Sequence, residues 1–280
     1  MKKSLQFVIV VFLMQQYTAA QTFDTIWGNR FQEVLDSVRA ANNIVGASAS
    51  VLVPGEGIWT GVSGYSVPFP PPQILLTPEM RLGIGSNSKL FTAVVMAKLQ
   101  EEGVLSLDDH LYQWLPAYQF VDSSITIRQL LSHQSGIFNF TDNGNFWNVV
   151  HADTGRFWTP EEVLDYLGAP YFEPGTGWRY SNTNYILAGM IIEAATGETW
   201  VQKLHDIIFD PLGMDSTFVG AYEPPNGPVA GTQWWGGGGP WYTSPITSVF
   251  SSCGPVGSIF STSQEMVQWY HALFSGELLS

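Results

Sequence analysis

The order of the periodic segments constrains the fold of this chain more than any other feature. A helical pattern over residues 23–42 comes first, with Ile26 and Phe31 among the apolar residues at helical spacing. Two strand-like runs, "IVGASASVLVP" and "GIWTGVSGYS", follow around the turn residues 54–57, which predicts a hairpin. Beyond the rigid connector "VPFPPPQ" (67–73) the chain is largely helical with loops. This order predicts an α/β part with an all-helical part inserted after it.

Segments in the helical part carry their own start and stop signals. The helix after Ser86 should end at Gly103, because glycine is favoured just past a helix C-terminus. "TPEEVLDYLG" opens with Thr159, Pro160 and Glu162, a capping box with proline at the first helical position. The glycine- and tryptophan-rich segment 231–245 is predicted to be a flexible surface loop that can border a site. Further helices are predicted over 184–197 and 199–213, both amphipathic, and over 261–276 as the final helix.

The amino-acid composition indicates which kinds of molecule the protein can bind. The chain has 280 residues, enough for one large or two small domains, and 45% of them are hydrophobic against 12% charged. The formal net charge of -13 disfavours nucleic acids and anionic membranes, because both are bound through Lys and Arg. A small or uncharged partner is therefore expected.

The first twenty residues have the pattern of an export signal. Lys2 and Lys3 give a positive start, residues 7–14 an unbroken apolar run, and residues 18–20 a small-residue cleavage site. The alternative is an N-terminal membrane anchor, but eight apolar residues are fewer than the roughly 20 that span a bilayer. Residues 1–20 are therefore predicted to be a signal peptide. The mature protein is expected to be periplasmic or secreted, without a stable membrane anchor after cleavage.

Cysteine and histidine give no sign of a disulfide or a metal site. Cys253 is the only cysteine, so no internal disulfide can form, and no histidine or basic residue stands near it in sequence. A buried small residue is a better interpretation of Cys253 than a nucleophile. The histidines are scattered without metal-ligand spacing, so neither a metal nor a cofactor is expected.

The segment "IGSNSKLFTA" (84–93) places Ser86 and Lys89 one helical turn apart at the head of an apolar run. Residues i and i+3 share one helix face, so the Lys89 amine can reach the Ser86 hydroxyl. Serine needs a neighbouring base to act as a nucleophile, and a desolvated lysine can serve because burial disfavours its charged form. The alternative is a serine that caps the helix beside a lysine that points to water. Ser-x-x-Lys is too short to decide between the two alone.

Four segments give Ser86 and Lys89 a family context. "GSNSKLFTA" resembles the nucleophile helix of the serine penicillin-recognising hydrolases, which include class C β-lactamases, D-alanyl-D-alanine carboxypeptidases and related esterases. "ITIRQLLSHQSGI", "EPGTGWRYSNTNYILAGMIIEAATG" and "GPVGSIFSTSQEMVQWYHALFSGELLS" are similar to later segments of that family and occur in the same order. The resemblance covers residues 24–280. It implies a β-lactamase/transpeptidase-like fold, with an antiparallel sheet flanked by helices.

The resemblance also implies roles for individual residues. The family's Tyr-x-Asn motif matches Tyr180 and Asn182. Tyr180 would share the serine's proton with Lys89 and return it to a leaving group, and Asn182 would orient Lys89 and a substrate amide. From the residues alone, a core aromatic is the better interpretation of Tyr180 and a helix cap that of Asn182. The family places a histidine at the position of His133 without using it as the base, so His133 is expected to be structural, bonding orphan carbonyls at a helix end.

One element of the family pattern has no counterpart in this sequence. The family carries Lys-Thr/Ser-Gly, or His-x-Gly, on a strand near its C-terminus that lines the substrate and donates an N–H to the oxyanion hole. This sequence has no such tripeptide, and it stops where the family continues through several strands. The domain over 21–280 is therefore expected to be incomplete, with its C-terminal strands missing. Its α/β part is placed at about 21–80 with the final helix, and its helical part at about 81–250.

The sequence thus predicts an exported serine hydrolase that acts on amide or ester bonds through an acyl-enzyme on Ser86. Ser86, Lys89 and Tyr180 are the predicted catalytic residues, and Asn182 is the predicted substrate-binding residue. The substrate is expected to be a small molecule or a peptidoglycan-like compound, with a β-lactam, a D-alanyl peptide and a small ester all left open. The alternative is a non-catalytic ligand-binding or sensor module of the same fold, which the absent tripeptide favours.

Overall fold

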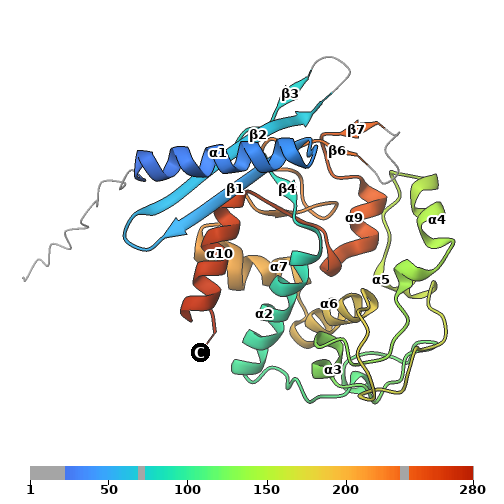
Figure 1. Ribbon diagram of the computed structural model, residues 1–280. Helices are drawn as coiled ribbons and strands as arrows, with labels where there is room; N and C mark the ends of the chain where they lie inside the picture. The colour runs from blue at the N-terminus through green and yellow to red at the C-terminus, as the bar shows by residue number, and fades with distance from the viewer. Residues whose placement is uncertain (1–22, 69–72, 234–239, 280) are drawn as a thin grey trace, which may run out of the picture.

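The computed structural model describes residues 23–68, 73–233 and 240–279 (Figure 1). The predicted signal peptide at 1–20 lies outside these residues, as do residues 69–72 of the proline-rich connector. The strands are β1 (Gly46–Val53), β2 (Gly57–Val67), β3 (Ile74–Leu75), β4 (Leu82–Gly83), β5 (Phe218–Val219), β6 (Thr232–Gln233), β7 (Trp241–Tyr242) and β8 (Ile259–Ser261). The helices are α1 (Thr25–Ala41), α2 (Ser88–Glu101), α3 (Ile127–Leu131), α4 (Phe146–Ala152), α5 (Pro160–Leu164), α6 (Thr183–Thr196), α7 (Trp200–Leu204), α8 (Asp210–Leu212), α9 (Thr247–Cys253) and α10 (Ser263–Ser275).

The predicted hairpin forms as β1 and β2. The two strands pair antiparallel from Gly46 opposite Gly64 to Val53 opposite Gly57, and β3 extends the sheet in the order β1-β2-β3. Gly64 has a φ of 83°, and a Cβ there would lie 2.2 Å from the carbonyl oxygen of Val45. Only glycine fits this close approach of the two strands.

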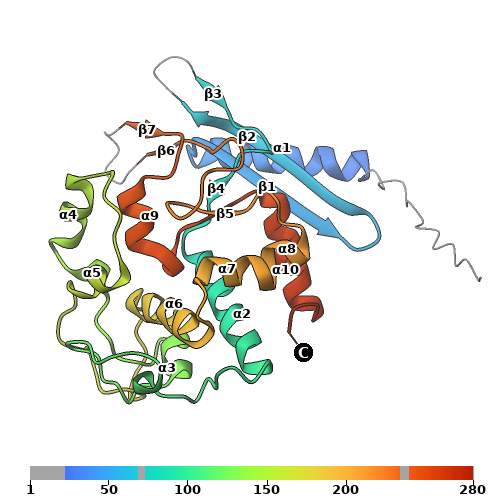
Figure 2. The same ribbon diagram turned by 180° about the vertical axis from the view of Figure 1, so that it is seen from behind.

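Helices cover this sheet on both faces. Trp59 of β2 packs against Phe31 of α1, with their ring centroids 5.3 Å apart. Its neighbour Thr60 shares a hydrogen bond with Ser50 of β1, whose hydroxyl also bonds Ser263 at the start of α10 (both 2.8 Å). Since successive strand residues point to opposite faces, α1 and α10 lie on opposite sides of the sheet (Figures 1 and 2). The first and last described helices therefore build one layered unit with the hairpin.

The centre of the helical part is α6, which was predicted to be amphipathic. That prediction is wrong, because every residue from Thr183 to Ile192 is buried. The helices α2, α3, α5 and α7 all contact it, so no face is left for solvent. Its sequence "TNYILAGMII" is apolar nearly all round, as expected for a helix covered on every side.

A second small sheet includes two strands, β4 and β5, from the region that was predicted to be helical, together with β8 beyond it. β8 lies between β4 and β5, in the order β4-β8-β5, and pairs antiparallel with both. This sheet joins the segment just before Ser86 to the segment just before α10. A boundary at residue 80 therefore does not separate strands from helices in this fold.

Two other segments differ in detail from their predictions. The helix expected over 199–213 is divided into α7, a π-helical turn at His205–Phe209, and α8. Within the loop expected over 231–245, β6 and β7 form a short antiparallel pair, and residues 234–239 lie outside the described residues.

The predicted helix ends are confirmed where residues signalled them. The capping box of Thr159 and Glu162 is present at α5, with Pro160 in its first turn. Gly103 and Gly276 follow α2 and α10 with φ angles of 72° and 79°, the left-handed conformation that ends a helix.

No helix within 23–68, 73–233 and 240–279 is both long and apolar enough to cross a membrane.

Candidate active site

Ser86 lies at an exposed turn that leads into α2. β4 is followed by a 3-10 turn at Gly85–Asn87, and α2 begins at the next residue. Gly85 has a φ of 54°, which allows the chain to turn sharply from the strand into the helix. The backbone N–H of Ile84 donates to the carbonyl of Ile259 in β8 (2.9 Å), which fixes the entry to the turn.

Lys89 points inward and contacts Ser86. Its Nζ donates to Ser86 Oγ (3.1 Å) and to the backbone carbonyl of Val256 (3.0 Å), and only 5% of the residue is exposed. The rings of Tyr180 and Tyr185 lie 5.0 and 5.8 Å from this nitrogen. The alternative in which Lys89 points to water is therefore wrong.

Burial changes the acidity of Lys89. Desolvation lowers the pKa of its ammonium from 10.5 to about 8, with the nearby Cys253 opposing the shift. Cys253 is half-buried rather than buried, and desolvation raises the pKa of its thiol to about 11, so the sulfur carries a proton near neutral pH. Lys89 can thus lose its proton close to physiological pH while the neighbouring thiol keeps its own.

This acidity gives a pH prediction. If neutral Lys89 is the base, acylation of Ser86 should rise with pH through an apparent pKa near 8 and then level off. The measurement is the pre-steady-state rate of acylation by an activated ester between about pH 6 and 10, compared with Lys89→Arg. The arginine variant stays charged and should show no such rise. A rate profile that is flat across this range in the unchanged protein would count against Lys89 as the base.

Tyr180 completes the contacts of the Ser86 hydroxyl. Its OH lies 2.9 Å from Ser86 Oγ, so one oxygen is shared by the lysine amine and the phenol. Tyr180 is 38% exposed, which excludes the alternative of a core aromatic. The structure thus brings together the three residues that the sequence singled out as catalytic.

His133 supports the segment that carries Tyr180. Its Nδ1 accepts hydrogen bonds from the N–H of Ser181 (3.2 Å) and from the amide of Asn184 (3.1 Å), which puts the ring proton on Nε2. Burial, followed by the charge of Lys89, lowers the pKa of the imidazole to about 4. The expected bond to orphan helix carbonyls is wrong. A φ of 60° at His133 turns the chain out of its helix, and the ring reaches the 181–184 segment instead.

The side chain of Asn182 bonds the turn at 139–142, whereas the family resemblance implied that it would orient Lys89 and a substrate amide. Its amide nitrogen donates to Thr141 Oγ1 (3.1 Å), and its backbone N–H donates to Asn139 Oδ1 (3.0 Å). Within the described part of the chain, Asn182 and Lys89 share no hydrogen bond. Asn182 precedes α6 without capping it through its side chain, so the helix-cap alternative is also wrong. The turn at 139–142 supplies its partners.

No pattern in the sequence indicates the backbone groups that hold Lys89. Three bonds tie α2 to the segment 255–259: Lys89 to the Val256 carbonyl, Thr92 to the Pro255 carbonyl (3.2 Å), and the Ile259 N–H to Ser88 Oγ (3.2 Å). A carbonyl oxygen is common to every residue, so its role has no side-chain signature. The glycines in "CGPVGS" were the available hint that this backbone follows a special path.

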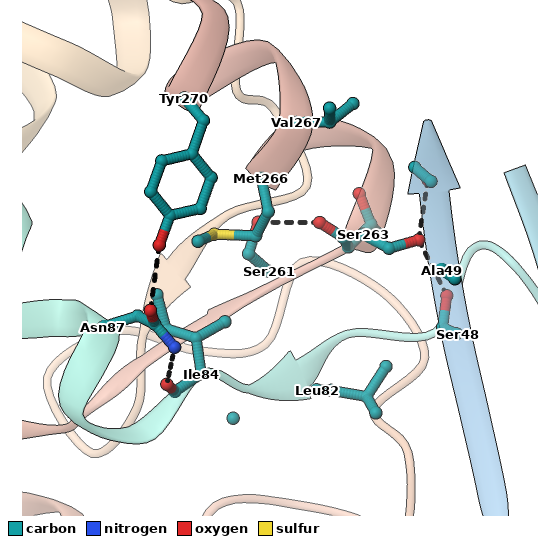
Figure 3. A pocket seen from close by; sticks show the side chains of 13 residues that line it. Ser48, Ala49, Leu82, Ile84, Asn87, Ser261, Ser263, Met266, Val267 and Tyr270 are labelled. Atoms are coloured by element: carbon teal, nitrogen blue, oxygen red, sulfur yellow. Dashed lines mark hydrogen bonds between the residues drawn. The ribbon is translucent and has the colours of Figure 1, made fainter. Parts of the chain in front are cut away.

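A groove of about 510 Å³ is lined by residues that flank Ser86 in sequence (Figure 3). It runs between β4, the start of α10 and the edge of β1, which pairs with β2 alone among the described strands. Its lining includes Ile84 and Asn87, on either side of Ser86 in sequence, and Tyr270, whose OH donates to Asn87 Oδ1 (2.9 Å). Ser86, Lys89 and Tyr180 are not part of this lining, so the reacting groups lie next to the groove and outside it.

In the part of the chain that the structure covers, no group of three or more His, Cys, Asp or Glu side chains is arranged to hold a metal ion.

Comparison with known proteins identifies relatives of this arrangement. The family model described as "Beta-lactamase" matches residues 31–280. Penicillin-binding protein 4* of Bacillus subtilis (strain 168) is 36% identical over 140 residues, which make up 49% of this chain and 30% of that protein. Penicillin-binding protein 4 of Amycolatopsis lactamdurans is 28% identical over 258 residues, 85% of this chain and 62% of that protein.

A solved structure is similar over most of the chain. The D-amino acid amidase of Ochrobactrum anthropi SV3, complexed with L-phenylalanine amide, superposes with a TM-score of 0.77 at 30% identity, covering 91% of this chain and 72% of that one. This similarity confirms the fold predicted from the sequence. The chain spans less than two thirds of the length of the two curated relatives, 30% and 62%.

Proposed function

This chain belongs to the β-lactamase family, and from that premise we propose that it is a serine hydrolase that opens amide or ester bonds through an acyl-enzyme on Ser86. The observation that supports this most is the shared hydroxyl. Ser86 Oγ lies 3.1 Å from Lys89 Nζ and 2.9 Å from the OH of Tyr180, on an exposed turn that a substrate can reach. A nucleophile with a base and a second proton carrier in contact is the requirement for this chemistry.

In the proposed first step, neutral Lys89 takes the proton of the Ser86 hydroxyl, directly or through Tyr180. The serine oxygen forms a bond to the substrate carbonyl carbon, and the carbonyl electrons move to its oxygen. The proton then passes through the Tyr180 hydroxyl to the leaving group as its bond to carbon breaks. Water repeats the sequence on the acyl-enzyme, releases the acid and restores Ser86.

The helix start favours the negative charge that forms on the carbonyl oxygen. Ser86 lies two residues before the start of α2, and the N–H groups of Asn87 and Ser88 already donate to the carbonyls of Ile84 and Gly85 in the turn that leads into the helix. The contribution proposed here is therefore that of the helix dipole, which favours an anion at this end. The burial of Lys89 keeps its amine partly neutral at the pH where the step occurs.

The substrate class proposed is a small amide or ester, with a β-lactam or a peptidoglycan-like D-alanyl peptide as specific candidates. The similarity to penicillin-binding proteins and to a D-amino acid amidase supports testing both kinds. The alternative, a non-catalytic sensor of the same fold, would acylate Ser86 and fail to release the product.

The test is turnover of nitrocefin, p-nitrophenyl acetate and the p-nitroanilides of D- and L-phenylalanine. We expect at least one of these compounds to be hydrolysed, and the rate to fall to background in Ser86→Ala. Hydrolysis that persists in Ser86→Ala would contradict the proposal. A stoichiometric burst with no later turnover would favour the sensor.

We also propose that the protein is exported, on the pattern of residues 1–20. The N-terminal sequence of the mature protein from a periplasmic or secreted fraction should begin near Gln21. A full-length protein that stays in the cytoplasm would contradict export.

A further inference from the structure

Trp178 lies exposed on the loop that carries Tyr180. It is 66% exposed, although its ring makes an edge contact with the His133 imidazole, 6.1 Å between centroids. The Tyr180 ring contacts the same imidazole at 4.5 Å. Trp178 and Tyr180, two residues apart in the same loop, therefore both contact the His133 ring. Tyr180 also lies within hydrogen-bond distance of Ser86.

The backbone on both sides of Trp178 is fixed. The N–H of Gly175 donates to the carbonyl of Gln134 (2.8 Å), and the N–H of Arg179 donates to the carbonyl of His133 (3.0 Å). The exposure of Trp178 is thus a property of an anchored loop.

The side chain of Arg179, between these two aromatic residues, packs against Tyr171 and Asp142. Its guanidinium lies 3.8 Å from the centroid of Tyr171 and 3.5 Å from the carboxylate of Asp142. Asp142 in turn accepts from the Tyr171 hydroxyl (2.7 Å). This cluster occupies Arg179, whereas the rings of Trp178 and Tyr180 both contact the His133 imidazole.

The position of Tyr180 in the proposed function indicates which part of a substrate Trp178 can meet. If the Tyr180 hydroxyl returns the proton to the leaving group, the leaving atom must lie within hydrogen-bond distance of that hydroxyl. From that hydroxyl, a leaving group that extends past the His133 imidazole, which both rings contact, would meet Trp178. A large exposed indole surface at that point favours a flat apolar partner.

We propose that Trp178 is a specificity-determining residue that contacts the leaving group and favours leaving groups with a larger aromatic surface. This inference rests on the proposed serine hydrolase function. An aromatic contact of this kind changes a rate constant by roughly three- to tenfold. It acts on substrate choice, with no part in the proton transfers.

The experiment compares phenyl acetate with 2-naphthyl acetate, whose leaving groups are similarly acidic but differ in aromatic surface. The readout is the ratio of kcat/KM for the two esters. We expect the unchanged protein to favour the naphthyl ester, Trp178→Ala to bring the ratio close to one, and Trp178→Phe to fall between. Trp27→Ala is the matched control, because Trp27 is 49% exposed on α1 and should leave the ratio unchanged.

The outcomes separate this inference from the proposed function. Ser86-dependent hydrolysis with the same ratio in Trp178→Ala would overturn the inference and leave the function standing. If neither ester is hydrolysed, the proposed function fails for esters, and the inference is tested by the binding of 2-naphthol and phenol. Trp178→Ala should then lose more affinity for 2-naphthol than for phenol. An equal loss, or no loss, for both compounds would overturn the inference.

Discussion

Replacing both Lys89 and Tyr180 is expected to slow ester hydrolysis no further than replacing either one alone. Both side chains contact the same Ser86 oxygen, so each loss breaks one proton-transfer unit. General acid–base groups contribute about 10²–10⁴ in rate, and residues that act as a unit are far from additive. Lys89→Ala, Tyr180→Phe and the double variant should therefore all fall to similar low values of kcat.

Matched controls exist for both substitutions. Lys98 lies further along α2 in a surface ion pair with Glu101, and Tyr112 is 63% exposed beside His110. Lys98→Ala and Tyr112→Phe should keep close to full activity. If the losses at Lys89 and Tyr180 multiply in the double variant, the two act independently. A fully active Tyr180→Phe would remove the phenol from the mechanism.

The largest effect on stability is expected from Arg81→Ala. Arg81 is 8% exposed, and its guanidinium donates to three backbone carbonyls, those of Glu79 (2.9 Å), Ser216 (3.1 Å) and Asn226 (3.2 Å). The three bonds are partly buried, and a hydrogen bond from a charged donor contributes about 1.5–3 kcal/mol. We expect the free energy of unfolding to fall by roughly 3 kcal/mol or more, measured by urea denaturation.

Arg128→Ala is the control for that measurement. The Arg128 side chain is 55% exposed in an ion pair with Asp108, and surface pairs contribute about 0–1 kcal/mol. Arg81→Lys should be intermediate, since an ammonium keeps the charge but cannot span three separated carbonyls. If Arg81→Ala is no more destabilised than Arg128→Ala, the guanidinium does not hold the 214–229 segment in place.

Local signals predicted the parts of the structure that depend on neighbouring residues. The capping box at Thr159, the glycine after α2 and the alternation of the hairpin each act over a few residues, so they can be seen in the sequence. Ser86 and Lys89 belong to this class as well, because i and i+3 on a helix are always close. The contact of Tyr180 joins segments 94 residues apart and came only from the family resemblance.

Features set by distant segments could not be predicted. The hydrogen-bond partners of Asn182 come from a turn 41–43 residues earlier in the chain, and no local pattern indicates them. The Val256 carbonyl that accepts from Lys89 is a backbone atom with no sequence signature. The burial of α6 from Thr183 to Ile192 depends on four other helices. Its apolar composition was visible, but the neighbours that cover each face were not.

The central claim is that Ser86 is the nucleophile, and covalent labelling tests it most directly. The protein is treated with a fluorophosphonate and its intact mass is measured, followed by mapping of the labelled peptide. The account predicts one adduct, located on Ser86, absent from Ser86→Ala and retained in Ser37→Ala, a change at an exposed serine of α1. An adduct on another serine, or one that persists in Ser86→Ala, would contradict it.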